Sequence, residues 1–597
     1  MAFQTPLAPA TLDAGADRVS ESTAPIQVAS LAAGAAALLS ACGGGGGSDN
    51  TVPGMANPVP VNANYRYTSA SNDQDAARLL LQAQFSATGS DIAAVRSQGY
   101  ANWLQQQVAR PQSGSGWDWL EAQGYGDVQN TARYYDSSSQ ADYMVWHQLI
   151  TAPDGMRKRM ALALSEFFVV SASGLNFTWR SHAIAHYWDT LNTHAFGNYR
   201  TLLEAVTLNV AMGYYLNTKG NQKANGKGSQ PDENYAREVM QLFSLGLVLL
   251  NPDGTAKLTD GKASDTYTAS DISNLAHVFT GYDVDQSQNV DTLIPQTGGG
   301  TRKVGNTAFA RLPMVLTDSK HSFIEISFLG IKIAANTPAK DALKTALDTL
   351  FQHPNTAPFF CKQMIQRLVT SNPSPAYVQR VAARFADNGN GVRGDLAAVW
   401  LAILLDDEAR GPAGLSDSAF GKLREPMLRF VQWARTFGAN STSGLWKIGD
   451  LSNPGSQLGQ SPLRSPSVFN FFRPGYVPPT TSLGAGAVAP EFQLVNEGSV
   501  GGYLNFMTNV LSRGLNSGDI KAGYGAELAL VTDAAALVQH LNTVLCAGQL
   551  NAANQALMVT ALNANAVTAA STDSVKKNRV YAAALMVLAS ANYLIQK

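Results

Sequence analysis

The sequence predicts a mainly α-helical protein: one large helical domain with long irregular loops and few short strands. Two observations support this fold class. After Asp73, apolar residues recur at the i, i+3, i+4, i+7 spacing that is typical of amphipathic helices. In addition, no series of apolar runs has the pattern of the buried strands of a parallel sheet, so we do not expect an α/β fold. With 597 residues, the chain is long enough to bury a large core.

The expected helices follow from this periodicity, together with capping residues and breakers at their ends. In chain order they cover residues 76–85, 91–108, 156–170, 179–216 (as two or three helices), 231–246, 270–279, 339–352, 356–368, 376–386, 394–405, 423–437, 503–513, 529–550 and 575–594. Residues 283–336 are weakly patterned, with short β-like runs, and we expect them to be irregular. Residues 444–490 are rich in Gly, Pro and Ser and predict a long ordered loop.

The helix expected at Pro231–Gly246 has a signal at each end. Pro231 suits the first helical position, and the two acidic residues that follow it favour the positive end of the helix dipole. Gly246 is a natural stop. The apolar face of this helix consists of Tyr235, Val239, Leu242 and Phe243. The opposite, polar face consists of Asn234, Arg237, Glu238 and Gln241.

Composition argues against one class of partner. The 43 basic and 44 acidic residues give a net charge of −1, and no basic patch with interleaved aromatic residues occurs, so we expect no nucleic-acid partner. Charged residues make up 15% of the chain, below the roughly 25% of typical soluble proteins. This is a feature of many exported proteins. Cys361 and Cys546 lie in apolar surroundings and are expected to be buried free thiols, with a disulfide between them as the alternative.

The N-terminal region carries the features of an export signal. The apolar run Val28–Ala41 is too short and too rich in Ala for a transmembrane helix but suits the core of a signal peptide. Leu39-Ser40-Ala41-Cys42 is similar to a bacterial lipoprotein signal, in which the thiol receives lipid. We therefore expect a protein of the cell envelope, in the periplasm or at the outer membrane or cell surface, anchored to the membrane through Cys42. The alternative is a cytoplasmic protein with a low-complexity N-terminus, because three acidic residues and a single base, Arg18, precede the run.

Four segments are therefore expected. Residues 1–42 are an export signal that ends at the lipoprotein-type cysteine, and residues 43–72 are a flexible Gly- and Pro-rich tether. Residues 73–490 are the main helical body, and residues 491–597 are a C-terminal helical part of the same body.

Glu166 is the first candidate for chemistry, because it lies in the apolar stretch Met160–Val170. A buried carboxylate needs a cationic or hydrogen-bonding partner, and Arg159 and Arg237 are the candidates. One interpretation is a structural ion pair between two core helices. The other is a catalytic site formed by Glu166, Arg237 and Glu238, in which burial raises the pKa of Glu166 so that it acts as a general acid or base.

Two further sets of residues are candidates for substrate binding. On the polar face of the 231–246 helix, Arg237 can hold a carboxylate, sulfate or phosphate, with Asn234 and Gln241 beside it, or it can cap nearby carbonyls. In the Pro-rich loop 460–476, Arg464 and Arg473 and the neighbouring aromatic residues can line a groove for a sugar or polymer. The alternative is that this loop fills the core, with Phe469 and Phe472 pointing inward.

A histidine pair is the candidate metal site, and a divalent metal is the one cofactor that the sequence suggests. His182 and His186 are four residues apart and share a helix face, and Asp189 continues that face. The alternative is that His186 packs beside Tyr187 and Trp188 while His182 is solvated.

From Asp73 to its end, the chain resembles the bacterial family catalogued as domain of unknown function 1800. The matching segments are Ala76–Phe85, Gly99–Trp103, Arg159–Glu166, Ala195–Arg200, Pro231–Gly246, Val278–Gly281, His353–Thr356, Leu368–Pro375, Gly391–Asp395, Leu458–Gln460, Ser467–Asn470 and Ala591–Gln596. The resemblance implies an exported, mostly helical bacterial protein without an agreed activity. Some members carry a Trp-His-Asn-His type motif where this chain has Leu164–Phe167, so a role tied to those histidines does not transfer.

Two classes of function follow. One is an enzyme, a hydrolase or a metal-dependent enzyme, that acts on cell-surface or extracellular material, with its site between the helices at 160–170 and 231–246. The other is a non-catalytic export or assembly factor that binds a partner exported protein, a partnership that the family resemblance also implies. A cavity that contains Glu166, Arg237 and Glu238 favours the enzyme, and a flat exposed apolar patch favours the partner-binding factor.

Overall fold

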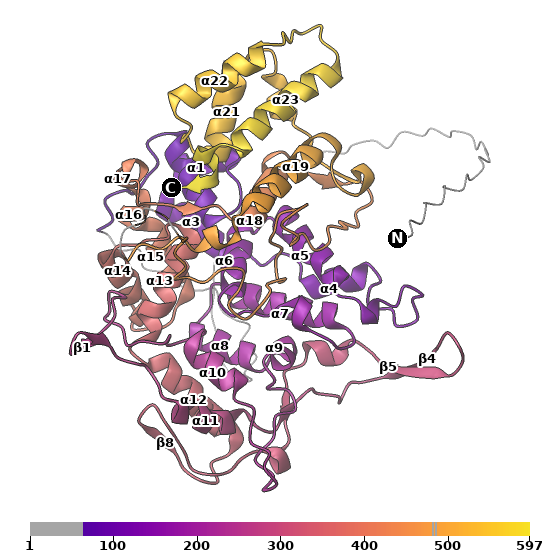
Figure 1. Cartoon of the computed structure of the whole chain (residues 1–597), viewed down its shortest axis with the longest axis vertical. Coiled ribbons are helices and arrows are strands. Elements are labelled where there is room, and N and C mark those ends of the chain that lie inside the picture. Colours follow the sequence, from indigo (N-terminus) through magenta and orange to yellow (C-terminus); the bar gives the residue numbers. More distant parts are fainter. Residues whose placement is uncertain (1–63, 480, 482, 484–485) are drawn as a thin grey trace, which may run out of the picture. The chain divides into compact units, whose positions relative to one another are not determined.

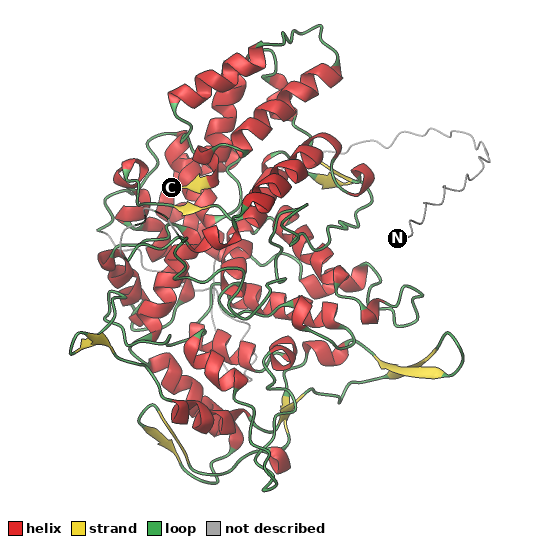
Figure 2. Cartoon of the chain, in the orientation of Figure 1, coloured by secondary structure: helices red, strands yellow, loops and turns green. Residues whose placement is uncertain are grey.

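The computed structural model describes residues 64–479, 481, 483 and 486–597. The expected signal, its lipidation candidate Cys42 and residues 43–63 of the expected tether lie outside these residues. Residues 55–597 form one compact unit. In its described part, 24 α-helices dominate, and the strands pair only into two-stranded antiparallel sheets, so the predicted mainly α fold is confirmed (Figure 2). No helix among the described residues combines the length and the apolar character that crossing a bilayer requires.

The helices follow the chain from the indigo to the yellow end of the ribbon (Figure 1). The first group is α1 (Asp73–Ala83), α2 (Gly89–Gln98), α3 (Tyr100–Ala109), α4 (Gly116–Ala122), α5 (Ser139–Thr151), α6 (Gly155–Ser165), α7 (Arg180–His194), α8 (Tyr199–Thr207) and α9 (Val210–Tyr215). The middle group is α10 (Asn234–Gln241), α11 (Ala269–Ala276), α12 (Ala339–Gln352), α13 (Thr356–Leu368), α14 (Pro375–Ala386), α15 (Leu396–Leu405), α16 (Asp407–Arg410), α17 (Ala413–Ser416) and α18 (Pro426–Thr436). The last group is α19 (Glu497–Arg513), α20 (Gly525–Ala529), α21 (Ala534–Cys546), α22 (Ala552–Asn563), α23 (Asp573–Leu588) and α24 (Ala591–Leu594).

The strands are short and lie mostly in the excursion between α10 and α12, as the weak patterning of residues 283–336 predicts. They are β1 (Leu258–Thr259), β2 (Lys262–Ala263), β3 (Tyr282–Asp283), β4 (Asp291–Pro295), β5 (Thr301–Gly305), β6 (Val315–Leu316), β7 (Ile326–Phe328), β8 (Ile331–Ile333), β9 (Lys422–Leu423), β10 (Asn440–Ser441), β11 (Ile520–Lys521) and β12 (Ile595–Gln596). The pairs are β1–β2, β3–β6, β4–β5, β7–β8, β9–β12 and β10–β11, all antiparallel.

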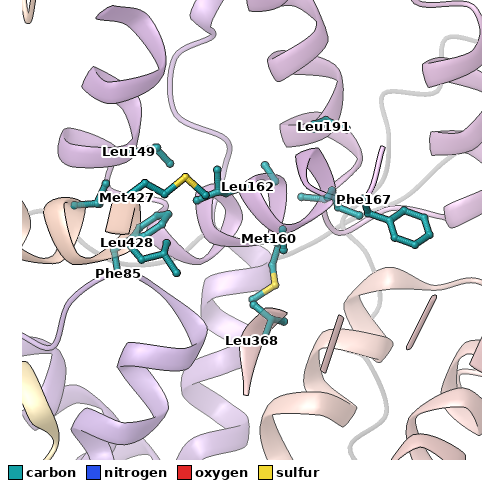
Figure 3. Close-up of a cluster of buried hydrophobic side chains, with 14 of the residues drawn as sticks. Phe85, Leu149, Met160, Leu162, Phe167, Leu191, Leu368, Met427 and Leu428 are labelled. Atoms are coloured by element: carbon teal, nitrogen blue, oxygen red, sulfur yellow. The ribbon is translucent and has the colours of Figure 1, made fainter. Parts of the chain in front are cut away.

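Helix α6 lies at the centre of the core. Every residue of α6 except Arg157 is buried, and the helix packs against α1, α3, α5, α7 and α13. Figure 3 shows Met160 and Leu162 of α6 among side chains from the surrounding segments, which include Leu149, Leu191, Leu368, Met427 and Leu428. Because burying one such side chain stabilises a fold by about 1.5–3 kcal/mol, this cluster fixes α6 and the residues that follow it, Glu166 and Phe167.

Helix α10 is shorter than predicted at both ends. The sequence favours a start at Pro231, whereas the helix begins at Asn234. The N–H of Asp232 donates to Asn221 Oδ1 (2.9 Å), and Asp232 Oδ1 accepts the N–H of Asn234 (2.8 Å). These bonds hold Pro231–Glu233 as a turn that leads into the helix. At the other end the helix stops at Gln241, before the predicted stop at Gly246. Residues 242–244 form a turn, and the N–H of Gly246 bonds to Met240 O while Gly246 adopts a left-handed φ of 76°.

Candidate functional site

Glu166 lies at the C-terminal end of α6 and is buried, but its cationic partner is not the predicted one. Arg237 lies on the exposed face of α10, where its Nη2 is 3.2 Å from Glu233 Oε2. The predicted meeting of Glu166 and Arg237 is therefore wrong. Arg367 of α13 takes that place, with Nε 3.5 Å from Glu166 Oε2 and Nη2 donating to Glu166 O at 2.9 Å. The other predicted partner, Arg159, also acts electrostatically on Glu166 and donates to the backbone of Arg367 at 2.7 Å.

Glu166 belongs to a set of charged side chains that we name the buried charge cluster. Its members are Arg159, Glu166, Arg367, Lys422, Glu425 and Glu491, each less than 7% exposed. Lys422 Nζ is 2.9 Å from Glu491 Oε1 and 3.4 Å from Glu425 Oε1. The pairing of β9 with β12 holds Lys422 in place, because Lys422 is opposite Gln596, which in turn donates to Leu368 O at 2.8 Å.

Burial and mutual charge set the protonation of the cluster. Burial raises the pKa of Glu166 well above its ordinary value, and the charge of Glu425 raises it further, against the opposing effect of Arg367. For Glu425, burial also favours the neutral form, but Lys422 and Arg159 outweigh it and lower the pKa. The cluster therefore shifts the pKa values of Glu166 and Glu425 in opposite directions.

A cleft of about 620 Å³ opens beside this cluster, and we name it the α13 cleft. Its floor is one face of α13, formed by Phe359, Lys362, Gln363, Gln366 and Arg367. One wall is the segment 241–254 that follows α10, and the other is made by residues of the loop 468–488. Glu166 and Phe167 close one side. The volume lies within the roughly 300–1,000 Å³ that is common for sites that bind organic ligands.

Side-chain amides of α13 and of the segment after it fix the second wall. Asn372 donates to Val488 O at 2.9 Å and accepts the N–H of Val488 at 2.8 Å, so its amide pairs with the loop backbone twice. Gln366 Nε2 donates to Ser371 O at 3.0 Å and approaches Pro474 O at 3.4 Å. The wall is therefore held by hydrogen bonds at two points along the loop.

The first wall comes close to α13 because of a glycine. A Cβ at Gly246 would lie 2.6 Å from the ring of Phe359, a distance that no side chain can accept without rearrangement. Gly246 also has the positive φ that favours glycine. The apolar surface of the cleft includes Leu242, Val248 and Phe359.

The charged groups that line the cleft are mostly cationic. Among the described residues they are Lys362, Arg367 and Arg473 against one carboxyl group, that of Glu166, whose pKa burial raises. Both carboxyl oxygens of Glu166 are buried. Burial lowers the pKa of Lys362, with Asp253 opposing the shift. Arg473 is exposed and lies over the ring of Phe469, 5.1 Å from its centroid. This arrangement suits a ligand with an apolar body and an anionic group.

The remaining predicted substrate-binding residues are divided between different places. Gln241 and Arg473 line the α13 cleft. Arg464 does not, because it forms a two-bond ion pair with buried Asp142, at 2.6 and 2.7 Å. Asn234, at the first turn of α10, also lies outside the cleft lining.

The predictions for Glu238 and for the aromatic residues of the Pro-rich loop are each met only in part. Glu238 is buried, and burial raises its pKa against the effect of Arg237, but it is not part of the cleft lining. In the Pro-rich loop, Phe472 fills the core as one interpretation predicts, whereas Phe469 is 39% exposed and lines the cleft.

The three predicted metal ligands have other partners. His182 Nε2 is 3.3 Å from Glu121 Oε1, and the His182 ring packs edge-on against Trp117 and Trp179. Asp189 accepts the N–H groups of Gly116 (2.6 Å) and Trp117 (2.9 Å) and so caps α4. Burial lowers the pKa of His186 to about 4. In the part of the chain that the structure describes, no group of three His, Cys, Asp or Glu side chains is placed to hold a metal ion, so the predicted triad is wrong.

The sequence interpretation missed the residues of α13. Lys362, Gln363, Gln366 and Arg367 interrupt the apolar pattern of this helix at positions that share one face. That polar stripe on a helix with buried surroundings is a signal of the same kind as the one noted on α10.

Comparison with known proteins identifies the family of this chain but finds no individual protein that matches it. The family model described as "Protein of unknown function (DUF1800)" matches residues 78–595. Neither the search of curated proteins nor the search of solved structures finds a match.

Proposed function

The chain belongs to the DUF1800 family, and we propose that it is a lipid-anchored protein of the bacterial cell envelope that binds cell-surface or extracellular material in the α13 cleft. The observation that carries this proposal is the lining of the cleft: apolar walls, side-chain amides, and three cations against one carboxyl group, whose pKa burial raises. The ligand class is an anionic molecule with an apolar portion.

The electrostatics of the cleft support an anionic ligand. Lys362 is largely removed from solvent, and its Nζ has only a weak hydrogen bond, 3.4 Å from Gly254 O. A carboxylate, phosphate or sulfate that reached it would gain a charge-assisted hydrogen bond in surroundings of low dielectric. Arg473 at the rim adds a second cation on an exposed loop.

A matched pair of probes tests the cleft. We expect a fluorescent fatty acid to bind the purified protein more tightly than its methyl ester, because only the acid carries the charge. Arg473→Glu should weaken binding of the acid by about tenfold and leave the ester unchanged. Arg513→Glu, the same change at an exposed site on α19 away from the cleft, is the control. Equal affinity for acid and ester, or equal effects of the two variants, would contradict the proposed ligand class.

A second candidate function is catalysis by Glu166. The observation in its favour is a carboxyl at one side of the cleft whose pKa burial raises, and a raised pKa favours the protonated form that a general acid needs. Glu166→Gln preserves the shape and the neutral charge. If the variant folds and retains ligand binding but loses turnover of a bound ligand, Glu166 is catalytic; unchanged turnover assigns it to the structure.

The envelope location rests on the N-terminal sequence. The segment Leu39–Cys42 has the pattern of a lipoprotein signal. Labelled palmitate should enter the wild-type protein and not Cys42→Ser. Label in both proteins, or in neither, would remove the lipid anchor from the proposal. Purification from the envelope would also show whether a second exported protein remains bound.

A further inference from the structure

A second cavity, of about 770 Å³, lies away from the α13 cleft and shares no lining residue with it. We name it the two-arginine cavity, after Arg78 of α1 and Arg410 of α16. Tyr100 of α3, Ser418 after α17 and Asn592 of α24 also line it. It therefore lies where the beginning, the middle and the end of the helical body meet.

Both arginines are buried, and their hydrogen bonds leave positive charge unneutralised. Arg78 Nη1 donates to the backbone oxygens of Gly411 (2.8 Å) and Arg410 (3.3 Å), and its Nε donates to Lys597 O (3.3 Å). Arg410 Nη2 donates to Gln82 Oε1, and its guanidinium lies 5.6 Å from the centroid of the Tyr100 ring. Arg78 Nη2 and Arg410 Nε have no hydrogen-bond partner among the described residues.

Burying two neighbouring arginine side chains costs folding free energy unless an anion occupies the cavity beside them. Burial lowers the pKa of Arg78 to about 9, and the charge of Arg410 adds to the shift. The pKa of Arg410 is lowered by burial as well. Asp75 is the one side-chain carboxylate among the described residues that line the cavity; it opposes the pKa shifts of both arginines, but it is only partly buried and accepts the N–H of Ser71 at 3.1 Å. Buried cations in proteins are normally paired with an anion.

The rest of the lining defines the ligand further. Hydroxyl and amide side chains make up a larger share of this lining than of the lining of the α13 cleft, among them Ser418 and Asn592. A hydrophilic ligand is therefore favoured over the partly apolar one that suits the α13 cleft. Guanidinium groups donate in a fork that matches the oxygens of a tetrahedral anion.

We propose that the two-arginine cavity binds the phosphate or sulfate group of a hydrophilic ligand, with Arg78 and Arg410 as the donors. The cavity is larger than a free phosphate or sulfate ion needs, so the natural ligand carries the anion on a polar body such as a sugar. This site is separate from the α13 cleft and does not depend on the function proposed for it.

The test is calorimetric titration of the full-length protein with sodium phosphate and with sodium sulfate, at constant ionic strength set by sodium chloride. Saturable binding of one ion per chain is expected for at least one of the two anions. The tighter anion identifies the group that the natural ligand carries. Absence of saturable binding of either anion would overturn the proposal.

Variants at exposed positions assign the binding to this cavity without disturbing the core. Ser418→Asp places a negative charge at the exposed edge of the cavity and should weaken binding about fivefold. Ser574→Asp, on exposed α23 outside the cavity, should leave it unchanged. Equal loss in Ser418→Asp and Ser574→Asp would place the anion elsewhere and refute the assignment. Arg410→Lys, which keeps the charge but not the fork, should also bind more weakly.

Discussion

Replacing Lys422 by Met tests whether the buried charge cluster stabilises the protein as its geometry implies. Lys422 is 1% exposed, and its ammonium group contacts Glu491 and Glu425 and donates to Arg367 O at 2.8 Å. The substitution keeps most of the side-chain volume and removes the charge. It leaves two buried carboxyl groups, Glu425 and Glu491, with one cation fewer between them.

The expected loss of unfolding free energy is about 4 kcal/mol. Removing one partner of a buried ion pair typically costs about 3–5 kcal/mol, because the remaining charge stays buried without compensation. The loss should be smaller at pH 5 than at pH 8. Burial already raises the pKa of Glu491, and loss of Lys422 raises it further, so protonation at low pH neutralises the orphaned acid. The double variant Lys422→Met, Glu491→Gln should recover part of the loss at pH 8.

Urea unfolding followed by circular dichroism measures the effect, with Lys332→Met as the control. Lys332 Nζ is 3.2 Å from Glu325 Oε1, but the two side chains are 70% and 57% exposed. The same substitution there should cost less than about 1 kcal/mol. If Lys422→Met is no more destabilising than Lys332→Met, or if its effect does not depend on pH, the reasoning about the cluster is wrong.

Three further predictions concern single sites. Gly246→Ala should lower the free energy of unfolding by more than about 2 kcal/mol, because the new methyl group would clash with Phe359 and the residue would be strained at positive φ. Gly261 has the same φ of 76° but open space around it, so Gly261→Ala should cost only about 1 kcal/mol; urea unfolding measures both. Burial raises the pKa of Asp189 to about 6 from 3.8, so the folded state holds the proton more tightly than the unfolded state. Stability should therefore fall by up to about 3 kcal/mol as pH rises from about 4 to about 6, and Asp189→Asn should flatten that part of the pH profile. Burial raises the pKa of the free thiols Cys361 and Cys546, so neither should react with maleimide until the protein is unfolded; modification of the native protein, detected by mass spectrometry, would contradict this.

The periodicity of the sequence predicts most of the longer helices but misses α5. Helix α5 has no counterpart among the expected helices. Its buried residues include Asp142, which pairs with Arg464, and Gln148, which donates to Gly114 O and accepts from Trp188. These polar residues interrupt the apolar stripe, and their partners are distant in sequence. Only the assembled structure shows that they are buried and satisfied.

Prediction of the candidate site from the sequence has the same limit: it does not show which distant residues come into contact. The apolar neighbours of Glu166 in the sequence predict that its carboxyl group is buried and needs a cationic partner. The identity of the cation does not follow, because Arg367 is 201 residues away and reaches Glu166 only through the packing of α13 against α6. Arg237 looks equally suitable on a helical wheel. Its face of α10 instead lies at the surface, where Arg237 pairs with Glu233 in the turn that precedes the helix.

The distribution of charge links the two cavities and narrows the class of ligand. The chain as a whole has a net charge of −1, yet the charged residues that line both cavities are mostly cationic. The rest of the chain must therefore carry an excess of negative charge. A small anion that enters either recess meets arginine and lysine side chains in surroundings of low dielectric, where attraction is strongest. This argues for ligands of limited size at both sites.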